Sequence, residues 1–486
     1  MERYTIAKLS KLYESGEVSP VEILELYQNR LLEQDKILNT GISPIENALE
    51  KAKAAEAAYK NGTATALTGI PLAIKDNICT KNTRTTCASR MLEEFRPPYN
   101  ATAVEKLEAA GAVPFYKANM DEFAMGGSGE TSYFGATKNP YDTTCVAGGS
   151  SSGSAASVAA GLSVAALGSD TGGSIRQPAA FCGVTGIKPT YGSVSRYGLV
   201  AFASSLDQIG PIANNSLDCG LLLNVLMGYD EHDGTSWKRQ YTDATSKIGQ
   251  SVKGMKIAVI RQLMGEGIAP DVREAVQKTI ANLEAQGAIV EEVNLDGLDH
   301  AIAAYYLISS AEASSNLARY DGVKYGYRTE NYGNIDELYR NTRKEGFGEE
   351  VKRRILLGTY ALCSGYYDDY YKKAVYIKEK LKENYAEIFK TYDVILSPTA
   401  PTTAYKLGGQ VEDPIQMYTA DICTVTVNLA GLPAASTPCG YGENGLPIGI
   451  SVIGRPFDEA TVLQVTSDIE SRFTREEPKN LEVGSC

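Results

Sequence analysis

The sequence has 486 residues and a formal net charge of −12, from 47 Lys and Arg against 59 Asp and Glu, with only two His. The two histidines, His232 and His300, exclude an HExxH motif or a His-rich metal site and leave few options for Ser-His-Asp or Cys-His catalysis. The acidic charge disfavours a protein that binds nucleic-acid duplexes, which needs a basic footprint, without excluding a local basic patch.

The first predicted elements are helices over residues 5–60, where Ser19-Pro20 supplies an N-cap and a first-turn residue. A short buried strand over 68–74 follows, and it ends at the charged pair Lys75-Asp76. The next predicted elements are a helix over 103–110 and a strand over 113–116.

Residues 121–205 are dense in Gly and Ser, a composition that alone would suit a flexible linker. A predicted helix over 155–160 and a predicted strand over 162–167 interrupt the Gly/Ser runs. A helix followed by a strand that opens into a Gly-rich loop is the layout of an α/β active site.

After Gly254 the pattern is again strand, helix, strand. The predicted elements here are a strand over 256–260, a helix over 272–283, a strand over 288–293, a tyrosine-rich helical region over 297–390, and strands over 394–396 and 447–452. No internal repeat and no long linker divides the chain, so we predict one large α/β domain.

Nine cysteines are widely spaced and include no CxxC pair, so we expect reduced thiols and no zinc site. They are Cys79, Cys87, Cys145, Cys182, Cys219, Cys363, Cys423, Cys439 and Cys486. The first residues lack the apolar core of a signal peptide. The smoothest apolar stretch, 155–167, is shorter than the about twenty residues that cross a bilayer. We therefore expect a cytoplasmic protein without a membrane segment.

Three short motifs suggest chemistry that the context disfavours. Gly149-Ser150-Ser151-Ser152-Gly153 fits the G-x-S-x-G nucleophile elbow, but the elbow needs a strand directly before it and a downstream acid and histidine. Asp170-Thr171-Gly172-Gly173 echoes the aspartic-protease loop, but no second copy supplies the partner carboxylate. The Gly-rich loops match neither GxxxxGK[ST] nor a GxGxxG behind a strand, so they give weak support for nucleotide binding.

A serine nucleophile paired with a lysine base remains compatible with these residues. Lys75 would have to lose its proton near neutral pH, whereas the reference lysine pKa is about 10.4. Burial beside the apolar strand over 70–74, or a nearby cation, would lower the pKa of Lys75. The alternative interpretation is a lysine that pairs with Asp76 at the end of a strand.

The segment 148–211 resembles the signature sequence of the amidase signature enzymes almost throughout, and residues 69–77, GIPLAIKDN, resemble the family's lysine motif. The resemblance covers essentially the whole chain. Within the family, four further segments favour the glutaminase subunits of tRNA-dependent amidotransferases: 121–126, 311–322, 352–360 and 427–433.

This resemblance implies an α/β fold in which a single large amidase domain, residues 1–486, has a mixed β-sheet covered by helices on both faces. We expect an N-terminal helical segment over 1–60 and a signature core over 61–250. The remainder, 251–486, would complete the sheet and carry the tyrosine-rich helices and the glutamine pocket.

The resemblance also implies a catalytic set in which Ser174 is the nucleophile and Ser150 bridges it to the base Lys75, with a cis peptide bond between Gly149 and Ser150. The backbone N–H groups of an oxyanion hole would come from Thr171, Gly172, Gly173 and Ser174. Glycine suits this loop because it lets the backbone approach the substrate closely.

By the same resemblance, Arg354 would bind the α-carboxylate of glutamine and Asp421 its α-ammonium, and Tyr305 and Met125 would also contact the substrate. From the residues alone, Arg354 could equally be a surface arginine after Arg353, and Tyr305 one of thirty tyrosines. One departure concerns residues 127–132, which read Gly-Ser-Gly-Glu-Thr-Ser where the family pattern has Ser-Ser-Thr-Glu-Asn-Ser. It affects the expected pocket wall or ammonia path rather than the catalytic set.

The implied function is a glutaminase subunit that hydrolyses glutamine to glutamate and supplies ammonia to a partner. This partner, the B-type subunit of the amidotransferase, would use ATP and Mg²⁺ to amidate Glu-tRNA(Gln) or Asp-tRNA(Asn). A small C-type subunit would complete a heterotrimer. No cofactor or metal is expected in this chain, and tRNA would bind mainly to the B-type partner. A stand-alone amidase acting on small amides shares the same catalytic set, and a non-catalytic scaffold is disfavoured because that set is intact.

Overall fold

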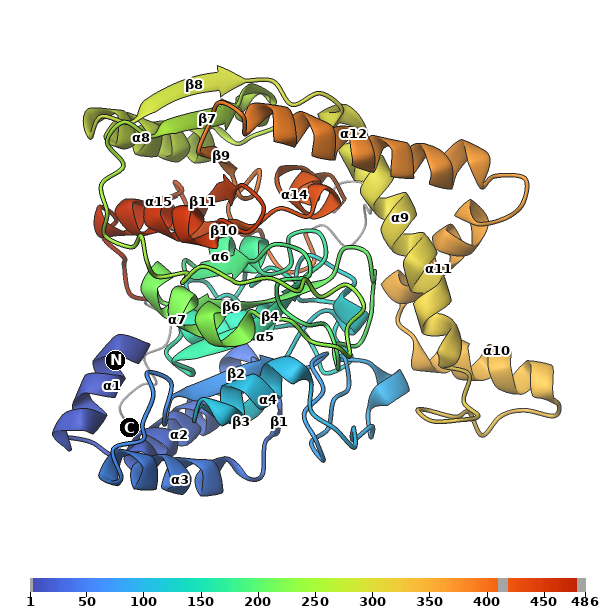
Figure 1. Cartoon of the computed structure of the whole chain (residues 1–486). Coiled ribbons are helices and arrows are strands. Elements are labelled where there is room, and N and C mark those ends of the chain that lie inside the picture. The colour runs from blue at the N-terminus through green and yellow to red at the C-terminus, as the bar shows by residue number, and fades with distance from the viewer. Residues whose placement is uncertain (1–2, 410–417, 479–486) are drawn as a thin grey trace.

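Eleven strands form one mixed β-sheet in the computed structural model, which describes residues 3–409 and 418–478 (Figure 1). The strand order is β1-β3-β2-β4-β6-β5-β10-β11-β9-β7-β8. The strands are β1 Gly41–Pro44, β2 Pro71–Lys75, β3 Val113–Ala118, β4 Ala165–Asp170, β5 Thr185–Lys188, β6 Gln208–Ala213, β7 Lys256–Ile260, β8 Ile289–Val293, β9 Val394–Pro398, β10 Ala434–Tyr441 and β11 Pro447–Gly454.

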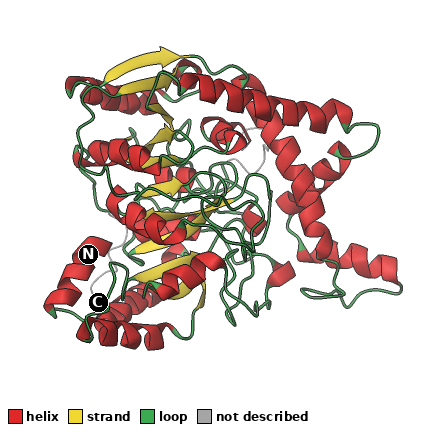
Figure 2. Cartoon of the chain, in the orientation of Figure 1, coloured by secondary structure: helices red, strands yellow, loops and turns green. Residues whose placement is uncertain are grey.

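Helices surround this sheet in the described part of the chain (Figure 2). They are α1 Ile6–Ser15, α2 Pro20–Leu38, α3 Ala48–Lys60, α4 Thr102–Ala109, α5 Ser152–Ala159, α6 Arg176–Phe181, α7 Ser216–Leu226, α8 Pro270–Ala285, α9 Ala301–Asn316, α10 Ile335–Gly346, α11 Glu349–Ala361, α12 Lys373–Ile388, α14 Val425–Ala430 and α15 Glu459–Ser471. Short turns of helix include η2 Glu122–Ala124 and η7 Ala420–Cys423.

The strand directions bring Lys75 and the Gly-rich loop that follows Asp170 to one edge of the sheet. Strand β2 runs parallel to both β3 and β4, and Ile74 on β2 pairs with Leu167 on β4. The carboxyl ends of β2 and β4 therefore lie side by side, where α/β sheets commonly bind ligands. These ends are Lys75 and Asp170.

Helices cover both faces of the sheet. Helix α7 contacts both α4 and α15, and the three helices pack on successive strands from β3 to β11, whereas α5 and α6 contact each other and the central strands. Every residue of α5 and α6 is buried. Helix α5 consists of Ser, Gly, Ala and Val, and a Cβ at Gly153 would lie 2.3 Å from the Thr40 carbonyl oxygen, so small residues let this helix lie in the core. Figure 1 shows α9, α10 and α11 along one side of the sheet.

The structure confirms the predicted single α/β domain and its strongly patterned elements. Ser19 caps α2 in a capping box with Pro20 at the first turn, and β2 ends at Lys75. Strands β1, β5, β6 and β10 were not predicted. Strand β6, for example, contains Gly210 and Pro211 and is buried on both faces, so it lacks the alternation that marks a half-exposed strand.

Two of the predicted boundaries that differ from the structure have a clear physical reason. The strand predicted over 162–167 begins at Ala165 and continues to Asp170, because the Leu162 amide closes the turn after α5 by donating to the Ser157 carbonyl oxygen. The helical region over 297–390 is interrupted at residues 320–334. Gly322 and Gly326 there have positive φ angles of 76° and 85°, which do not continue a right-handed helix.

Within residues 3–409 and 418–478 the eight cysteines are free, and Cys486 lies outside the described residues. No helix of this part of the chain is long and apolar enough to cross a membrane. The same residues contain no cluster of three or more His, Cys, Asp or Glu side chains arranged to hold a metal ion. His232 and His300 are both exposed at the surface.

Candidate active site

Lys75 and Ser150 are in direct contact at the carboxyl edge of the parallel strands. The Lys75 Nζ donates to Ser150 Oγ at 2.8 Å and to the Ser169 carbonyl oxygen at 3.2 Å. Lys75 ends β2, Ser150 lies in the loop before α5, and both side chains are fully buried. The parallel β2–β4 pairing thus joins residues that are 75 positions apart in the sequence.

The environment of Lys75 favours its neutral form. Burial lowers the pKa of Lys75 to about 7, although the carboxylates of Asp121 and Asp170 act in the opposite direction. Asp76 does not pair with Lys75, because its carboxylate lies 3.7 Å from the Lys117 ammonium and accepts a hydrogen bond from the Thr86 amide. The alternative interpretation of Lys75 as the ion-pair partner of Asp76 is therefore wrong.

Ser174 lies in the loop between β4 and α6, next to the loop that carries Ser150. The Ser174 carbonyl oxygen accepts a hydrogen bond of 3.1 Å from the Ser151 amide, and the Gly149–Ser150 peptide bond is cis. The Ser174 side chain is 7% exposed, and its hydroxyl makes no hydrogen bond within residues 3–409 and 418–478. The structure therefore places Ser150 and Ser174 on adjoining loops and joins Ser150 to Lys75, at the end of β2, by a direct hydrogen bond.

Asp170 anchors the loop that presents Ser174. Its carboxylate accepts hydrogen bonds from the amides of Gly173 at 2.8 Å and Ile175 at 3.2 Å. It also forms a fully buried ion pair with Arg176, at 3.0 Å from Nε. Burial alone would raise the pKa of Asp170, but the Arg176 guanidinium holds it well below its usual range. The carboxylate therefore stays ionised, and it fixes the loop at both ends of Ser174.

The predicted oxyanion donors lie on this same loop. The Gly173 N–H is engaged by Asp170, whereas the N–H groups of Thr171, Gly172 and Ser174 have no acceptor in the described part of the chain. A Cβ at Gly172 would lie 2.4 Å from Tyr305 Cζ. Gly173 has a φ of +135°, and a Cβ there would meet Thr424 Oγ1 at 2.4 Å. Both glycines are thus required by close packing, and Gly173 also by its backbone conformation.

Arg354 is a buried side chain of the predicted glutamine pocket. It is 3% exposed, and its Nε donates to Glu350 Oε1 at 2.7 Å, one helical turn away on α11. Within residues 3–409 and 418–478 its one hydrogen bond is this bond from Nε, so neither Nη group is engaged there. Because a bidentate carboxylate pair uses two N–H groups of one guanidinium, Arg354 retains donors for a ligand. The alternative interpretation, a surface arginine following Arg353, is wrong.

Asp421 is half-buried on η7, and it accepts a hydrogen bond of 2.6 Å from the Tyr306 hydroxyl. Burial raises the pKa of Asp421 to about 6. The Tyr306 ring also faces Arg354, whose Cζ lies 4.9 Å from the ring centroid. Tyr306 thus contacts both charged groups predicted for the pocket, and its neighbour Tyr305 packs on Gly172 of the Ser174 loop.

Met125 and the segment that departs from the family pattern border the same site. Met125 is fully buried in one hydrophobic cluster with Tyr305. The segment 127–132 folds around Asp121, whose carboxylate accepts hydrogen bonds from the Gly129 amide at 3.0 Å and the Thr131 hydroxyl at 2.9 Å. A Cβ at Gly127 would lie 3.9 Å from Asp421 Oδ1, so this segment lies beside the charged part of the pocket.

Several residues of the site were not predicted from the sequence. One is Glu350, which precedes the predicted Arg354 by four residues. This is the spacing of an ion pair on one helix face, so the sequence did carry a signal for Glu350. Asp170 and Arg176 both lie inside the signature segment, but only the folded loop shows that they pair. Tyr306 carried no local signal, because its partner Asp421 lies 115 residues away.

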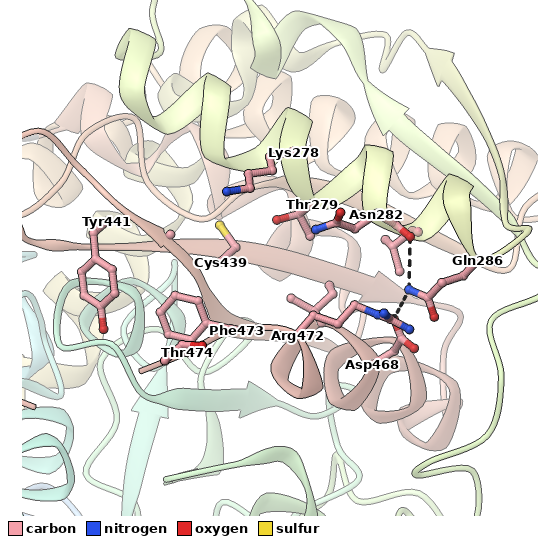
Figure 3. Close-up of a pocket in the computed structure, with 13 residues that line it drawn as sticks. Lys278, Thr279, Asn282, Gln286, Cys439, Tyr441, Asp468, Arg472, Phe473 and Thr474 are labelled. Carbon is pink, nitrogen blue, oxygen red and sulfur yellow. Dashed lines mark hydrogen bonds and ion pairs between the residues drawn. The ribbon is translucent and has the colours of Figure 1, made fainter. Parts of the chain in front are cut away.

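A surface cavity of about 350 Å³ lies between α8, β10 and α15 (Figure 3). Lys278, Cys439 and Arg472 are among its lining residues, and Gln286 donates a hydrogen bond to Asp468 at its rim. None of the predicted site residues lines it. The cavity is therefore separate from the candidate active site.

The chain matches the amidase family over residues 22–463. It is 52% identical over 474 residues to a protein of Ruminiclostridium cellulolyticum named as the A-type subunit of glutamyl-tRNA(Gln) amidotransferase, an alignment covering 97% of this chain and 98% of that protein. A crystal structure of a protein with the same name from Thermotoga maritima has 43% identity and a TM-score of 0.77, over 93% of this chain and 92% of that one. A peptide amidase from Stenotrophomonas maltophilia shares the fold with a TM-score of 0.83 at 28% identity, over 98% of both chains. This chain belongs to the amidase family.

Proposed function

We propose that this protein is the glutaminase subunit of a tRNA-dependent amidotransferase. It hydrolyses the side-chain amide of glutamine to glutamate and ammonia. The observation that carries the proposal is the 52% identity over 97% of the chain to a protein named as the A-type subunit of glutamyl-tRNA(Gln) amidotransferase, together with the opposite charges of Arg354 and Asp421 beside the Ser174 loop.

In the proposed mechanism, neutral Lys75 accepts a proton from Ser150 as Ser150 takes the proton of Ser174. The Ser174 Oγ then attacks the amide carbonyl, and loop N–H groups stabilise the oxyanion. The amide nitrogen leaves as ammonia with the proton returned through Ser150, and an acyl-enzyme remains. Water, activated by the same base, attacks the ester and releases glutamate and free Ser174. The hydrogen bond of 2.8 Å between Lys75 and Ser150 supports the first transfer.

The substrate pocket explains why glutamine rather than a simple amide would bind. The two Nη groups of Arg354, which make no hydrogen bond in the part of the chain that the structure describes, suit an α-carboxylate, and Asp421 Oδ1 suits an α-ammonium. Such a pocket favours an amino-acid zwitterion, because a neutral amide would displace water from the Arg354 Nη groups and Asp421 Oδ1 without supplying the hydrogen bonds of an α-carboxylate and an α-ammonium.

The ammonia would pass to the B-type partner, which amidates Glu-tRNA(Gln) or Asp-tRNA(Asn). This partner would bind the ATP, the Mg²⁺ and most of the tRNA, and the C-type subunit would complete a heterotrimer. The net charge of −12 supports this division of labour, since tRNA binding needs a basic surface. Translation uses charged tRNA in the cytoplasm, so we propose a cytoplasmic location.

The test is co-purification from the native cell followed by measurement of ammonia release from glutamine, with and without ATP and Glu-tRNA(Gln). We expect release from glutamine that changes when the partner, ATP and charged tRNA are added. Glutaminase activity unaffected by these additions would favour the stand-alone amidase. A Ser174→Ala protein that still released ammonia would exclude Ser174 as the nucleophile.

A further inference from the structure

Tyr306 lies between the two charged side chains of the pocket. Its hydroxyl donates to Asp421 Oδ2 at 2.6 Å, and its ring centroid lies 4.9 Å from Arg354 Cζ. It is 5% exposed, so its position is set by packing within the protein. The predicted substrate contact on this turn of α9 is Tyr305, whose ring packs against Gly172 of the Ser174 loop.

Contacts through Glu350 and Tyr418 also link Arg354 to Tyr306. The Arg354 Nε donates to Glu350 Oε1 at 2.7 Å, and the Tyr418 hydroxyl donates to the same oxygen at 3.2 Å. The Tyr418 ring in turn stacks on the Tyr306 ring at 3.9 Å between centroids. Rotation of the guanidinium would therefore break its bond to Glu350 and its contact with the Tyr306 ring together.

Each contact of Tyr306 leaves a ligand-binding edge free. The guanidinium lies over the ring, a contact that uses no Nη hydrogen bond, so the planar fork of Nη groups remains available to a carboxylate. The hydroxyl occupies only Asp421 Oδ2, so Oδ1 can accept from an ammonium. The hydrogen bond also favours the ionised form of Asp421, which is the form that binds a cation.

We propose that Tyr306 is a positioning residue that fixes the relative placement of Arg354 and Asp421 and thereby selects α-amino-acid amides as substrates. This inference rests on the proposed function. Tyr306 acts through its two neighbours and need not touch the reacting amide.

The groups that face Asp421 determine how removal of the Tyr306 hydroxyl changes the pKa of Asp421. Burial raises the pKa of Asp421 to about 6, Tyr306 and Arg354 lower it, and Asp170 raises it. Arg176 also lowers the pKa of Asp421, and Tyr305, Tyr405 and Cys423 lie close enough to interact with its charge. Loss of the Tyr306 hydrogen bond therefore raises the pKa of Asp421, and the anion is lost at a higher pH than in the wild type.

The experiment uses Tyr306→Phe in the full chain, as purified with its partner subunits. kcat/KM for ammonia release is measured from pH 5.5 to 8.5, a range of about three pH units around neutrality. The substrates are glutamine and glutaramate, which is glutamine without its α-ammonium. The ratio of kcat/KM for glutamine to kcat/KM for glutaramate does not depend on the protonation of Lys75, because both substrates need the same base. We expect Tyr306→Phe to lower this ratio about tenfold at pH 7 and to move its acid midpoint upward.

Tyr392→Phe is the matched control, because the Tyr392 hydroxyl donates to Glu291 Oε2 at the same 2.6 Å in an exposed hydrogen bond outside the site. It should change neither the ratio nor its midpoint. In an Asp421→Asn background, Tyr306→Phe should lower the ratio little further, since the charge that it supports is already absent.

The outcomes separate this inference from the proposed function. A wild-type complex that releases no ammonia from glutamine overturns the proposed function. With an active wild type, an unchanged ratio and midpoint in Tyr306→Phe overturns the role of Tyr306. Equal losses on glutamine and glutaramate also overturn it, because they indicate a general structural effect rather than selection of the ammonium.

Discussion

The protonation of Lys75 controls the predicted chemistry, and Lys75→Arg tests it directly. Burial lowers the pKa of Lys75 from 10.5 to about 7, so about half of the amines are neutral at pH 7. With an unperturbed pKa, roughly one in a few thousand would be neutral at that pH. Burial thus increases the population of the base roughly a thousandfold. The guanidinium of an arginine remains protonated throughout this range and cannot act as a base.

We therefore expect the wild-type kcat/KM for glutamine to rise more than tenfold per pH unit below about pH 6, where Asp421 also loses its proton, and to level off above the Lys75 pKa near 7. Lys75→Arg should lower kcat/KM by about 100- to 10,000-fold and remove the part of this rise with a midpoint near pH 7. Ammonia release, measured in the presence of a coupled dehydrogenase, reports both effects. Circular dichroism establishes that the variant is folded.

Lys188→Met provides a matched control. Lys188 is also buried with its pKa lowered to about 7, but its Nζ donates to the Pro189 carbonyl oxygen at 2.9 Å and not to Ser150. This variant should keep a midpoint near pH 7, because Lys75 is unchanged. A wild-type profile that is flat from about pH 5.5 to 8, or a folded Lys75→Arg with activity within tenfold of wild type, would refute the lysine-base mechanism.

Three further predictions concern stability, the Ser174 loop and the histidines. The pKa of Lys75 is lower in the folded than in the unfolded chain, so burial of the charged amine lowers the free energy of unfolding. This loss of stability is complete below pH 7 and disappears as the pH rises toward 10.5. Lys75→Met should therefore raise the free energy of unfolding at pH 6 by about 3 kcal/mol, with a smaller gain at pH 9, and a loss of stability in denaturant titrations at pH 6 would contradict this. Gly172→Ala should lower kcat/KM at least about tenfold, because its Cβ would lie 2.4 Å from Tyr305 Cζ, and steady-state kinetics with wild-type values would show that the loop accommodates the methyl group. The double variant His232→Gln, His300→Gln should acylate with glutamine at nearly the wild-type rate in rapid-quench experiments, because both side chains are exposed. Loss of acylation in a folded double variant would contradict the lysine mechanism.

Much of the fold was predictable because its signals are local. The Ser19 capping box and the strand that ends at Lys75 depend on residues that are close in sequence. Strands β5 and β6 were missed, since a short strand buried on both faces carries no alternation. Interruption of the helical region near Gly322 depends on positive φ angles, which composition alone does not reveal.

The residues of the candidate site also fall into those that the sequence indicated and those that only the structure revealed. The resemblance to the amidase signature singled out Lys75, Ser150 and Ser174, and the roles of these residues remain predictions. It did not single out Tyr306 or Asp170, whose partners depend on how distant segments meet. Asp421 lies 115 residues from Tyr306, and only packing of η7 against α9 brings the two together.

The sequence by itself determined the residue types available for chemistry: two histidines, a Gly/Ser-rich signature segment and a lysine at the end of an apolar strand. Tertiary structure decided which of the charged groups pair. Asp76 pairs with Lys117, which leaves Lys75 to Ser150, and Arg354 rather than Arg353 is buried. The physical reason is that pairing and pKa depend on distance and burial. Strand order and helix packing set the distance and the burial of groups that are far apart in the sequence, and no local pattern encodes these.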